Sequence, residues 1–414
     1  MLFYLVMDSA NERNIVHFDL DTFFVSVERL HNPKLRGVPV LIGGTSERGV
    51  VASCSYEARL FGVHNGMSMK IARRLCPQAI AMRGDAGLYS RHSKVVTQIL
   101  RDNVPLLEKA SVDEFYIDMT GMDKVFGIRK YISELRDKVI KETSLPISMG
   151  LSLNKTVSKV AAGECKPQGK MMIDIGREKG FLAPLSVRKL PLVGNETYEV
   201  LSELGIKTIG TLQQVPQTRM EKVLGKNGIT LWQRAQGIDL SPVKPYYERS
   251  SLSLERTFDK DTIDFTRLTN TLTAMVEGLG FQLRMGNKMT ACISVKVRYS
   301  DMQVAQKQKR IPYTSCDHIL LGIATRLLTD LFSRRQLVRL VGVTVSELVE
   351  GGHQINMLDD SIELIQLYQR MDFLKKKYHD SRLIMRANTM EQRNLGVWDP
   401  WTGEPPTPGG HRHA

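Results

Sequence analysis

The most informative stretch of the chain reads IVHFDLDTFFVSVE and runs from Ile15 to Glu28. Its opening, Ile15–Asp19, is an apolar run rich in β-branched residues, which predicts a strand. The run ends in an acid, and a carboxylate beside an apolar strand costs free energy unless its charge is compensated. Asp19 is therefore a candidate functional residue.

Two more acids, Asp113 and Glu114, stand between the short apolar runs 106–110 and 115–119. We expect these runs to be strands and the two acids to lie in the turn between them. An acid-bearing strand beside an acid-bearing hairpin would gather oxygen ligands of the kind that Mg²⁺ prefers. Taken singly, each acid is equally explained as a solvated turn residue or as a salt-bridge partner.

The first 165 residues alternate between strand-like and helix-like patterns. Further strands are expected at 38–42, 50–53 and 147–151, and helices at 88–101, 125–143 and 154–165. This order indicates a layer of mostly antiparallel sheet packed by helices.

Beyond this layer, Lys166-Pro167-Gln168-Gly169 interrupts the last helix, because Pro and Gly both break helices. Residues 180–240 read as short helices joined by glycine turns, and 241–249 reads as a linker. Residues 250–350 form another unit with strands and helices. One helix-like stretch, about 359–378, follows before an end rich in Gly and Pro.

Composition narrows the class of protein. With 414 residues the chain is too long for one core, so two to four domains are expected. Lys and Arg number 57 against 44 Asp and Glu, a net charge of +13 that favours a polyanionic partner. No apolar run reaches the roughly 20 residues of a bilayer span, and we do not interpret Met1–Val6 as a signal peptide. The five cysteines are scattered along the chain and lack the spacing of a metal site, so we predict no zinc site. They are Cys54, Cys76, Cys165, Cys292 and Cys316.

Positive charge is concentrated between residues 281 and 340, a segment that contains 11 basic residues and only three acids. The basic residues are Arg284, Lys288, Lys296, Arg298, Lys307, Lys309, Arg310, Arg326, Arg334, Arg335 and Arg339. Such a surface suits a polyanionic partner. Alternatively, Lys307, Lys309 and Arg310 lie in a solvated loop.

The first stretch closely resembles the opening motif of the Y-family DNA polymerases, and four further matches follow in the family's order. They are Val51–Val63 (VASCSYEARLFGV), Ser111–Phe115 (SVDEF), Gly150–Lys155 (GLSLNK) and Ala161–Gly169 (AAGECKPQG). The resemblance spans about 15–350 and is strongest to bacterial members. It implies a template-directed DNA polymerase that bypasses lesions with low fidelity and low processivity, and that has no proofreading exonuclease.

The resemblance also implies roles for individual residues. Asp19, Asp113 and Glu114 match the catalytic carboxylates that hold two Mg²⁺ ions, and Leu20 matches a position that offers its backbone carbonyl to a metal. Phe24 matches the steric gate, a flat ring that excludes a ribose 2′-hydroxyl, and Phe23 matches the position beside it. The remaining substrate contacts implied are Ser53, near the nascent base pair or the triphosphate, and Tyr56, Arg59 and Lys166 at the incoming triphosphate.

The fold implied is α+β, in the shape of a right hand. It has a ferredoxin-like palm (1–22 and 88–175), small fingers (23–87), a helical thumb with helix-hairpin-helix turns (176–240), a linker (241–249) and an α/β little finger (250–350). The rest, 351–414, is a tail. Small fingers close loosely over the new base pair, so discrimination by shape is poor.

The tail holds the segment Gln354-Ile355-Asn356-Met357-Leu358, which resembles the pentapeptide by which bacterial polymerases dock on the sliding clamp. An unremarkable tail segment is the alternative. Expected partners are primer–template DNA, deoxynucleoside triphosphates and this clamp, for a monomer without membrane association. The expected location is the cytoplasm, at the bacterial nucleoid.

Two other functions compete with the polymerase. A scaffold with the same fold and no catalysis is disfavoured because all three acids are present. A two-metal nuclease is disfavoured because Phe24, Tyr56 and Arg59 suit a nucleoside triphosphate.

Overall fold

The structure is a computed structural model that describes residues 13–46, 48–122, 127–245, 248–332, 336–351 and 362–377. The chain divides into two compact units between residues 246 and 247. Among the residues described, we find no helix with the length and apolarity that a membrane span requires.

The first unit is built on a five-stranded sheet. Its strands are β1 (Ile15–Leu20), β5 (Leu106–Lys109), β6 (Glu114–Asp118), β7 (Ile147–Ser152) and β8 (Lys170–Met172). They lie in the order β5-β6-β1-β7-β8, with all pairs antiparallel except β7 with β8. Helices α5 (Ala86–Arg101) and α6 (Ile128–Thr143) complete the βαββαβ order of a ferredoxin-like layer, as predicted.

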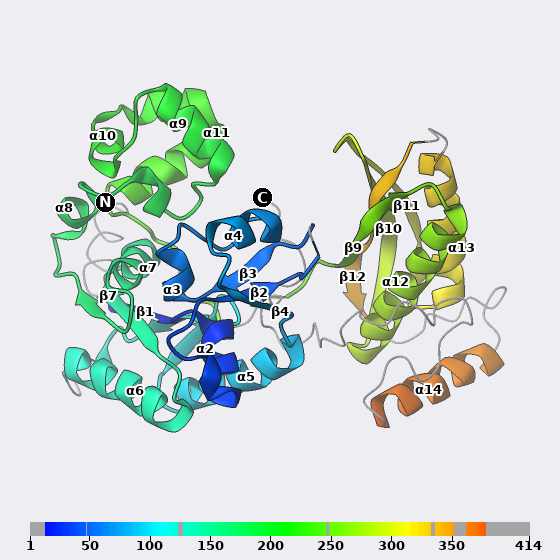
Figure 1. The fold of residues 1–414 in the computed structure, drawn as a ribbon, viewed down its shortest axis with the longest axis horizontal. Coiled ribbons are helices and arrows are strands. Elements are labelled where there is room, and N and C mark those ends of the chain that lie inside the picture. The colour runs from blue at the N-terminus through cyan, green and yellow to red at the C-terminus, as the bar shows by residue number, and fades with distance from the viewer. Residues whose placement is uncertain are drawn as a thin grey trace. The chain divides into compact units, whose positions relative to one another are not determined.

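Helices cover both faces of this sheet (Figure 1). Because side chains alternate along a strand, Val16 and Phe18 of β1 point to one face, where they join a core with α5, α6 and helix α2 (Phe23–His31). His17 and Asp19 point to the other face, and helix α7 (Lys155–Glu164) packs against β1 and β7.

A smaller three-stranded sheet lies in the same unit. It is formed by β2 (Val40–Gly43), β3 (Val51–Cys54) and β4 (Ile80–Met82), with β2 in the middle. The 3-10 turn η1 (Pro33–Leu35) precedes it, and helices α3 (Tyr56–Arg59) and α4 (Met69–Leu75) follow β3. Leu41, Val51, Ala58 and Met69 bury this small layer's own core.

Short helices follow the five-stranded sheet, as the glycine turns predicted. They are α8 (Glu178–Leu182), the 3-10 turn η3 (Val187–Lys189), α9 (Asn195–Glu203), α10 (Ile209–Gln214) and α11 (Gln217–Ala235). Their apolar side chains share one core with Val157 and Val160 of α7. Gly225, at φ 60°, interrupts α11 with a non-helical residue, so α11 is two helices joined by a kink.

The first half of the expected linker is fastened to the first unit. Arg13 donates to the carbonyls of Asp239 and Ser241, and the backbone N–H of Lys244 donates to Glu108 Oε2 at 2.7 Å. Val243 packs with Ile15 and Tyr116. Residues 241–245 are therefore part of this unit rather than a free tether.

The second unit repeats the order βαββαβ with a different strand arrangement. Its elements are β9 (Ser251–Thr262), α12 (Phe265–Met285), β10 (Lys288–Tyr299), β11 (Val304–Thr314), α13 (Asp317–Leu331) and β12 (Val338–Glu350). The strands lie in the order β11-β10-β12-β9, all antiparallel. Both helices pack into the core of this sheet.

Helix α14 (Ile362–Lys377) belongs to the second unit. Arg284 of α12 donates to Asp372 on α14 and to Asp317 on α13, and its side chain is buried. The hydroxyl of Tyr368 accepts a hydrogen bond from the His318 N–H. α14 is thus tied to both helices by polar contacts.

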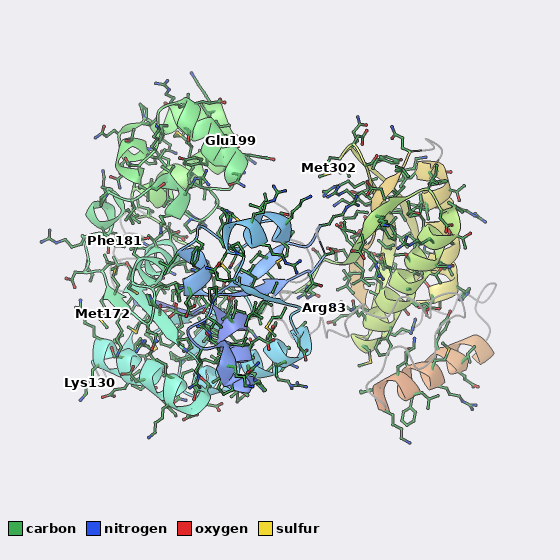
Figure 2. The ribbon with its side chains drawn as sticks, viewed as in Figure 1. Arg83, Lys130, Met172, Phe181, Glu199 and Met302 are labelled. Carbon is green, nitrogen blue, oxygen red and sulfur yellow. The ribbon has the colours of Figure 1, made fainter. Side chains whose placement is uncertain are left out.

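The basic residues of the second unit are less free than their number suggested. Lys288, Lys296 and Arg310 each pair with a glutamate that lies outside the 281–340 window. The alternative of a solvated loop is wrong, because Lys307, Lys309 and Arg310 lie on the exposed edge strand β11. Exposed charged side chains such as Lys130 on α6 and Glu199 on α9 also project from the helices of the first unit (Figure 2).

One close approach in the first unit leads to a test. A Cβ at Gly150 of β7 would lie 2.1 Å from Ser158 O and 2.6 Å from Ala162 N, both backbone atoms of α7. Gly150→Ala should push α7 off the sheet and lower the free energy of unfolding by about 1–3 kcal/mol, measured by urea denaturation. Gly163→Ala on the same helix meets nothing within 4 Å and should be neutral or stabilising. Equal stability of the two variants would show that the close approach is not required.

Candidate active site

Two of the predicted acids are neighbours across the central strands. Asp19 of β1 stands opposite Glu114 of β6 and opposite Ser148 of β7. Glu114 is the first residue of β6, not a turn residue as we expected, because its backbone joins the sheet ladder. Asp113 precedes it, and the Leu20 N–H donates to the Asp113 carbonyl at 2.9 Å. The sheet thus brings all three acids to one end of β1 and β6.

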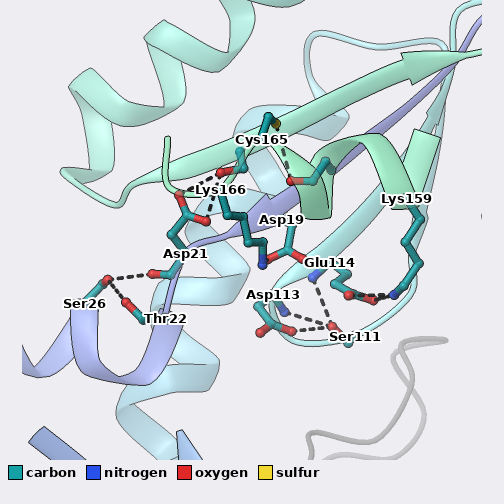
Figure 3. A network of polar contacts seen from close by, with 12 residues as sticks. Asp19, Asp21, Thr22, Ser26, Ser111, Asp113, Glu114, Lys159, Cys165 and Lys166 are labelled. Carbon is teal, nitrogen blue, oxygen red and sulfur yellow. Dashed lines mark hydrogen bonds and ion pairs between the residues drawn. The ribbon is translucent and has the colours of Figure 1, made fainter. Parts of the chain in front are cut away.

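Each acid has a partner (Figure 3). Lys166 Nζ lies 2.5 Å from Asp19 Oδ1, and Lys159 Nζ lies 2.5 and 2.7 Å from the two carboxylate oxygens of Glu114. The Ser111 hydroxyl donates to Asp113 at 2.5 Å. The salt-bridge alternative therefore describes the contacts of Asp19 and Glu114 in this structure.

Burial and crowding shift the acidity of the three carboxyls. Burial raises the pKa of Asp19 to about 7, against the opposing effect of the Lys166 ammonium and with help from the charges of Glu114 and Asp113. Burial also raises the pKa of Asp113. For Glu114, burial is outweighed by nearby positive charge, including Lys159, and the pKa lies below its usual value. Negative charge at Asp19 is therefore costly unless a cation compensates it.

The donor chemistry of this cluster suits a hard divalent cation, since it consists of carboxylate and carbonyl oxygens. In the described part of the chain, no three His, Cys, Asp or Glu side chains converge as a ready metal site. Lysine ammonium groups hold Asp19 and Glu114 instead. A metal at these oxygens would replace one form of charge compensation by another.

The two predicted sugar contacts begin helix α2. Thr22 before them has a left-handed backbone, with φ 42° and ψ 46°, which is uncommon for a β-branched residue and turns the chain sharply from β1 into α2. Phe24 is 8% exposed and stacks on Tyr89, with ring centroids 4.2 Å apart and planes at 12°. Phe23 is buried beside it, 5.7 Å between centroids. Tyr89 was not predicted from the sequence.

The predicted phosphate contacts of the small layer lie on α3. The Tyr56 hydroxyl donates to Asp21 Oδ1 at 3.3 Å, and the Arg59 guanidinium carbon lies 4.9 Å from the Tyr56 ring centroid. Ser53 is buried on β3, opposite Ile42. Ser55 caps α3 by accepting from the Ala58 N–H, which fixes the start of this short helix.

Several residues at this site were not predicted from the sequence, chiefly Lys159, Ser111, Asp21 and Ser148. Lys155 and Lys159 are four residues apart and so share one side of α7, which was a readable signal for cations facing the sheet. Lys155 pairs with Glu108 of β5, and Lys159 with Glu114. The predicted clamp segment, Gln354–Leu358, lies outside the described residues.

Comparison with known proteins gives this arrangement a family. Residues 18–163 match the impB/mucB/samB family, residues 249–357 match its C-terminal domain, and residues 188–239 match the thumb domain described as DNA polymerase-iota. The DNA polymerase IV of Dehalococcoides mccartyi is 36% identical over 370 residues, which are 88% of this chain and 95% of that protein. The DNA polymerase IV of Treponema denticola is 33% identical over 374 residues, 89% and 95% of the two chains.

Solved structures agree. A Y-family DNA polymerase chimera built on Dbh superposes with a TM-score of 0.72 and 25% identity, over 82% of this chain and all of that one. The chain belongs to the Y family of DNA polymerases. An insertion ternary complex of Dbh DNA polymerase covers the same shares at 25% identity, with a TM-score of 0.59. This Y-family member is a DNA-directed DNA polymerase, and its five-stranded sheet is the palm of the right-hand fold.

Proposed function

We propose that this Y-family polymerase performs translesion synthesis by two-metal-ion nucleotidyl transfer, adding deoxynucleotides to the primer end of primer–template DNA. The observation that carries the proposal is the pairing of Asp19 with Glu114 across β1 and β6, with Asp113 beside them. This end of the palm sheet concentrates negative charge at a place where burial makes it costly.

The metal ligands in this proposal are the carboxylates of Asp19, Asp113 and Glu114 and the carbonyl of Leu20. Two Mg²⁺ ions, when bound, supply Lewis acidity to the primer hydroxyl and charge stabilisation to the leaving pyrophosphate. Lys166 and Lys159 pair with Asp19 and Glu114 and so compensate their charge. The oxygen-only donor set accommodates Mg²⁺ and also Mn²⁺.

The nucleotide is held by Tyr56, Arg59 and Lys166 at its triphosphate. Arg59 offers a planar guanidinium that can bind two phosphate oxygens at once. Lys166 offers a point charge, and its Nζ lies 2.5 Å from Asp19 Oδ1, an oxygen that would bind a metal. Phe24 excludes the ribose 2′-hydroxyl. Its stacking on Tyr89 restricts rotation of the Phe24 ring away from the sugar. Phe23 and Ser53 complete the sugar and base contacts.

Low fidelity and low processivity follow from the small fingers, since their three-stranded sheet and three short α-helices offer little surface to close over a base pair. We assign 1–22 and 88–175 to the palm, 23–87 to the fingers, 176–240 to the thumb and 250–350 to the little finger. We also propose that proofreading exonuclease activity is absent. Exposed Lys307, Lys309 and Arg310 on β11 suit contact with the DNA backbone.

We propose further that Gln354–Leu358 docks on the sliding clamp, and that the protein is a monomer of the bacterial cytoplasm at the nucleoid. Tethering by a clamp would raise the local concentration of primer ends for an enzyme that grips DNA weakly.

The central test is primer extension by the wild type and Asp113→Ala on undamaged and abasic templates, with Mg²⁺ and deoxynucleotides. The wild type should extend briefly and continue past the lesion, and Asp113→Ala should lose at least about 10²–10³-fold in rate while still binding primer–template. Asp118→Ala, at the other end of β6, is the matched control and should remain active. A wild type that binds DNA without extending it would favour the scaffold, and strand cutting without nucleotides would favour the nuclease. Loss of folding in Asp113→Ala would make that acid structural.

Sugar selectivity tests the gate. Phe24→Ala should raise the ratio of ribonucleotide to deoxynucleotide kcat/KM by about 10- to 100-fold, because the clash with a 2′-hydroxyl disappears. Phe24→Tyr keeps the flat ring and should keep the selectivity. The same ratio in Phe24→Ala and wild type would remove Phe24 from this role.

Clamp docking can be measured directly. Replacing Met357 and Leu358 together by Ala should weaken binding to a purified bacterial sliding clamp at least about tenfold, since two apolar anchors are lost. Leu367→Ala, which removes an exposed leucine of α14, should leave binding unchanged. If both proteins bind the clamp equally well, the pentapeptide is not the docking segment.

A further inference from the structure

Asp21 is a second buried acid at the end of β1, and none of the roles above uses it. Its side chain is 1% exposed, although it lies only two residues beyond Asp19. A buried carboxylate is tolerated only where donors or cations compensate it. The donors that reach Asp21 therefore show what it holds.

Three segments converge on this carboxylate. The Ser148 hydroxyl of β7 lies 2.9 Å from both oxygens, the Gln168 N–H donates to Oδ2 at 2.7 Å, and the Tyr56 hydroxyl reaches Oδ1 at 3.3 Å. They come from the palm sheet, from the turn after α7, and from the first residue of α3. One side chain thereby joins palm and fingers.

The turn after α7 is fixed from two sides. Asp21 holds the Gln168 N–H, and Arg136 of α6 donates to the Gln168 carbonyl at 2.6 Å. Arg136 is buried and also donates to the Ile147 carbonyl at 2.8 Å, so it is itself anchored to β7. Lys166 lies two residues before Gln168, so its side chain extends from a backbone that is held in a fixed position.

Tyr56 is oriented by the same carboxylate. Burial and the charge of Asp21 both raise the pKa of Tyr56, which keeps the hydroxyl protonated and able to donate. The ring of Tyr56 in turn lies under the Arg59 guanidinium. At 3.3 Å the Tyr56 contact is the longest of the four, beyond the usual 2.7–2.8 Å of an O–H···O bond, so it is the easiest to exchange for a phosphate oxygen.

We propose that Asp21 is a positioning residue for the incoming nucleotide: it holds Tyr56 and the Lys166 turn in place without touching the triphosphate. The inference rests on the proposed assignment of Tyr56 and Lys166 to the triphosphate. Asp21 keeps its bonds to Ser148 and Gln168 when the Tyr56 hydroxyl turns to a phosphate, so the site stays assembled during exchange.

The test is a split between KM and kcat. Asp21→Asn retains the shape but cannot accept hydrogen bonds on both arms, so KM for the deoxynucleotide should rise about 5- to 10-fold. The kcat should change less than about threefold, and the affinity for primer–template should stay unchanged. Glu108→Gln is the matched control. Glu108 is a 3% exposed carboxylate of the same sheet that accepts from Lys155 and from the Lys244 N–H. This variant should lose stability without raising KM for the nucleotide.

Two further variants separate this inference from the assignment beneath it. Tyr56→Phe and Lys166→Ala should each raise KM for the nucleotide, and Tyr56→Phe combined with Asp21→Asn should cost less than the sum of the two changes. If Tyr56→Phe and Lys166→Ala raise KM but Asp21→Asn does not, the role of Asp21 is overturned and the triphosphate assignment stands. If neither Tyr56→Phe nor Lys166→Ala affects KM, the triphosphate assignment itself fails.

If Asp21→Asn fails to fold, the proposal is tested instead by the KM of Ser148→Ala. This variant removes one donor and leaves the carboxylate with Gln168 and Tyr56, and it should raise KM about two- to fivefold. An unchanged KM in folded Ser148→Ala would then overturn the proposal.

Discussion

The antiparallel register of β1 with β6 is the constraint from which the site follows, because it sets Asp19 directly opposite Glu114. Two carboxylates side by side at the end of a buried sheet repel one another and lose hydration, and burial disfavours the charged form of both. The surrounding structure answers this cost with cations from α7 and the turn behind it. Helix α7, which covers the sheet, thus also supplies a positive charge, Lys159, that compensates Glu114.

The same lysines offset the cost of holding carboxyl groups close together, because each pairs with one of them. Lys159 and Lys166 carry positive charge on side chains long enough to move, and both are partly exposed. In the proposed function the carboxylates would bind metal ions, and Lys166 would contact the triphosphate.

Much of the fold could be predicted from local pattern. The strands around Asp19 and at 147–151, and the helix ending near Arg101, were recoverable because apolar runs and helical spacing are properties of short segments. The identity of the partners was not recoverable, since it depends on how α7 docks across the sheet. Glu108 illustrates this limit: nothing in residues 241–249 indicates that the Lys244 N–H ends on that carboxylate. Similarly, the basic window 281–340 looked unopposed because its compensating glutamates lie at 248, 255, 347 and 350.

Most side chains of helix α7 are buried or partly buried against other parts of the first unit. One side meets β1 and β7, another contributes Val157 and Val160 to the core of the thumb helices, and a third carries Lys155 and Lys159 to the acids. Its start is held by Asn154 and Thr156, which bond to Gly237 and Asp239. Of its ten residues only Gly163 is exposed. Most positions on this helix are therefore constrained by neighbours, and a randomised library of the segment would tolerate the widest range of residues at Gly163.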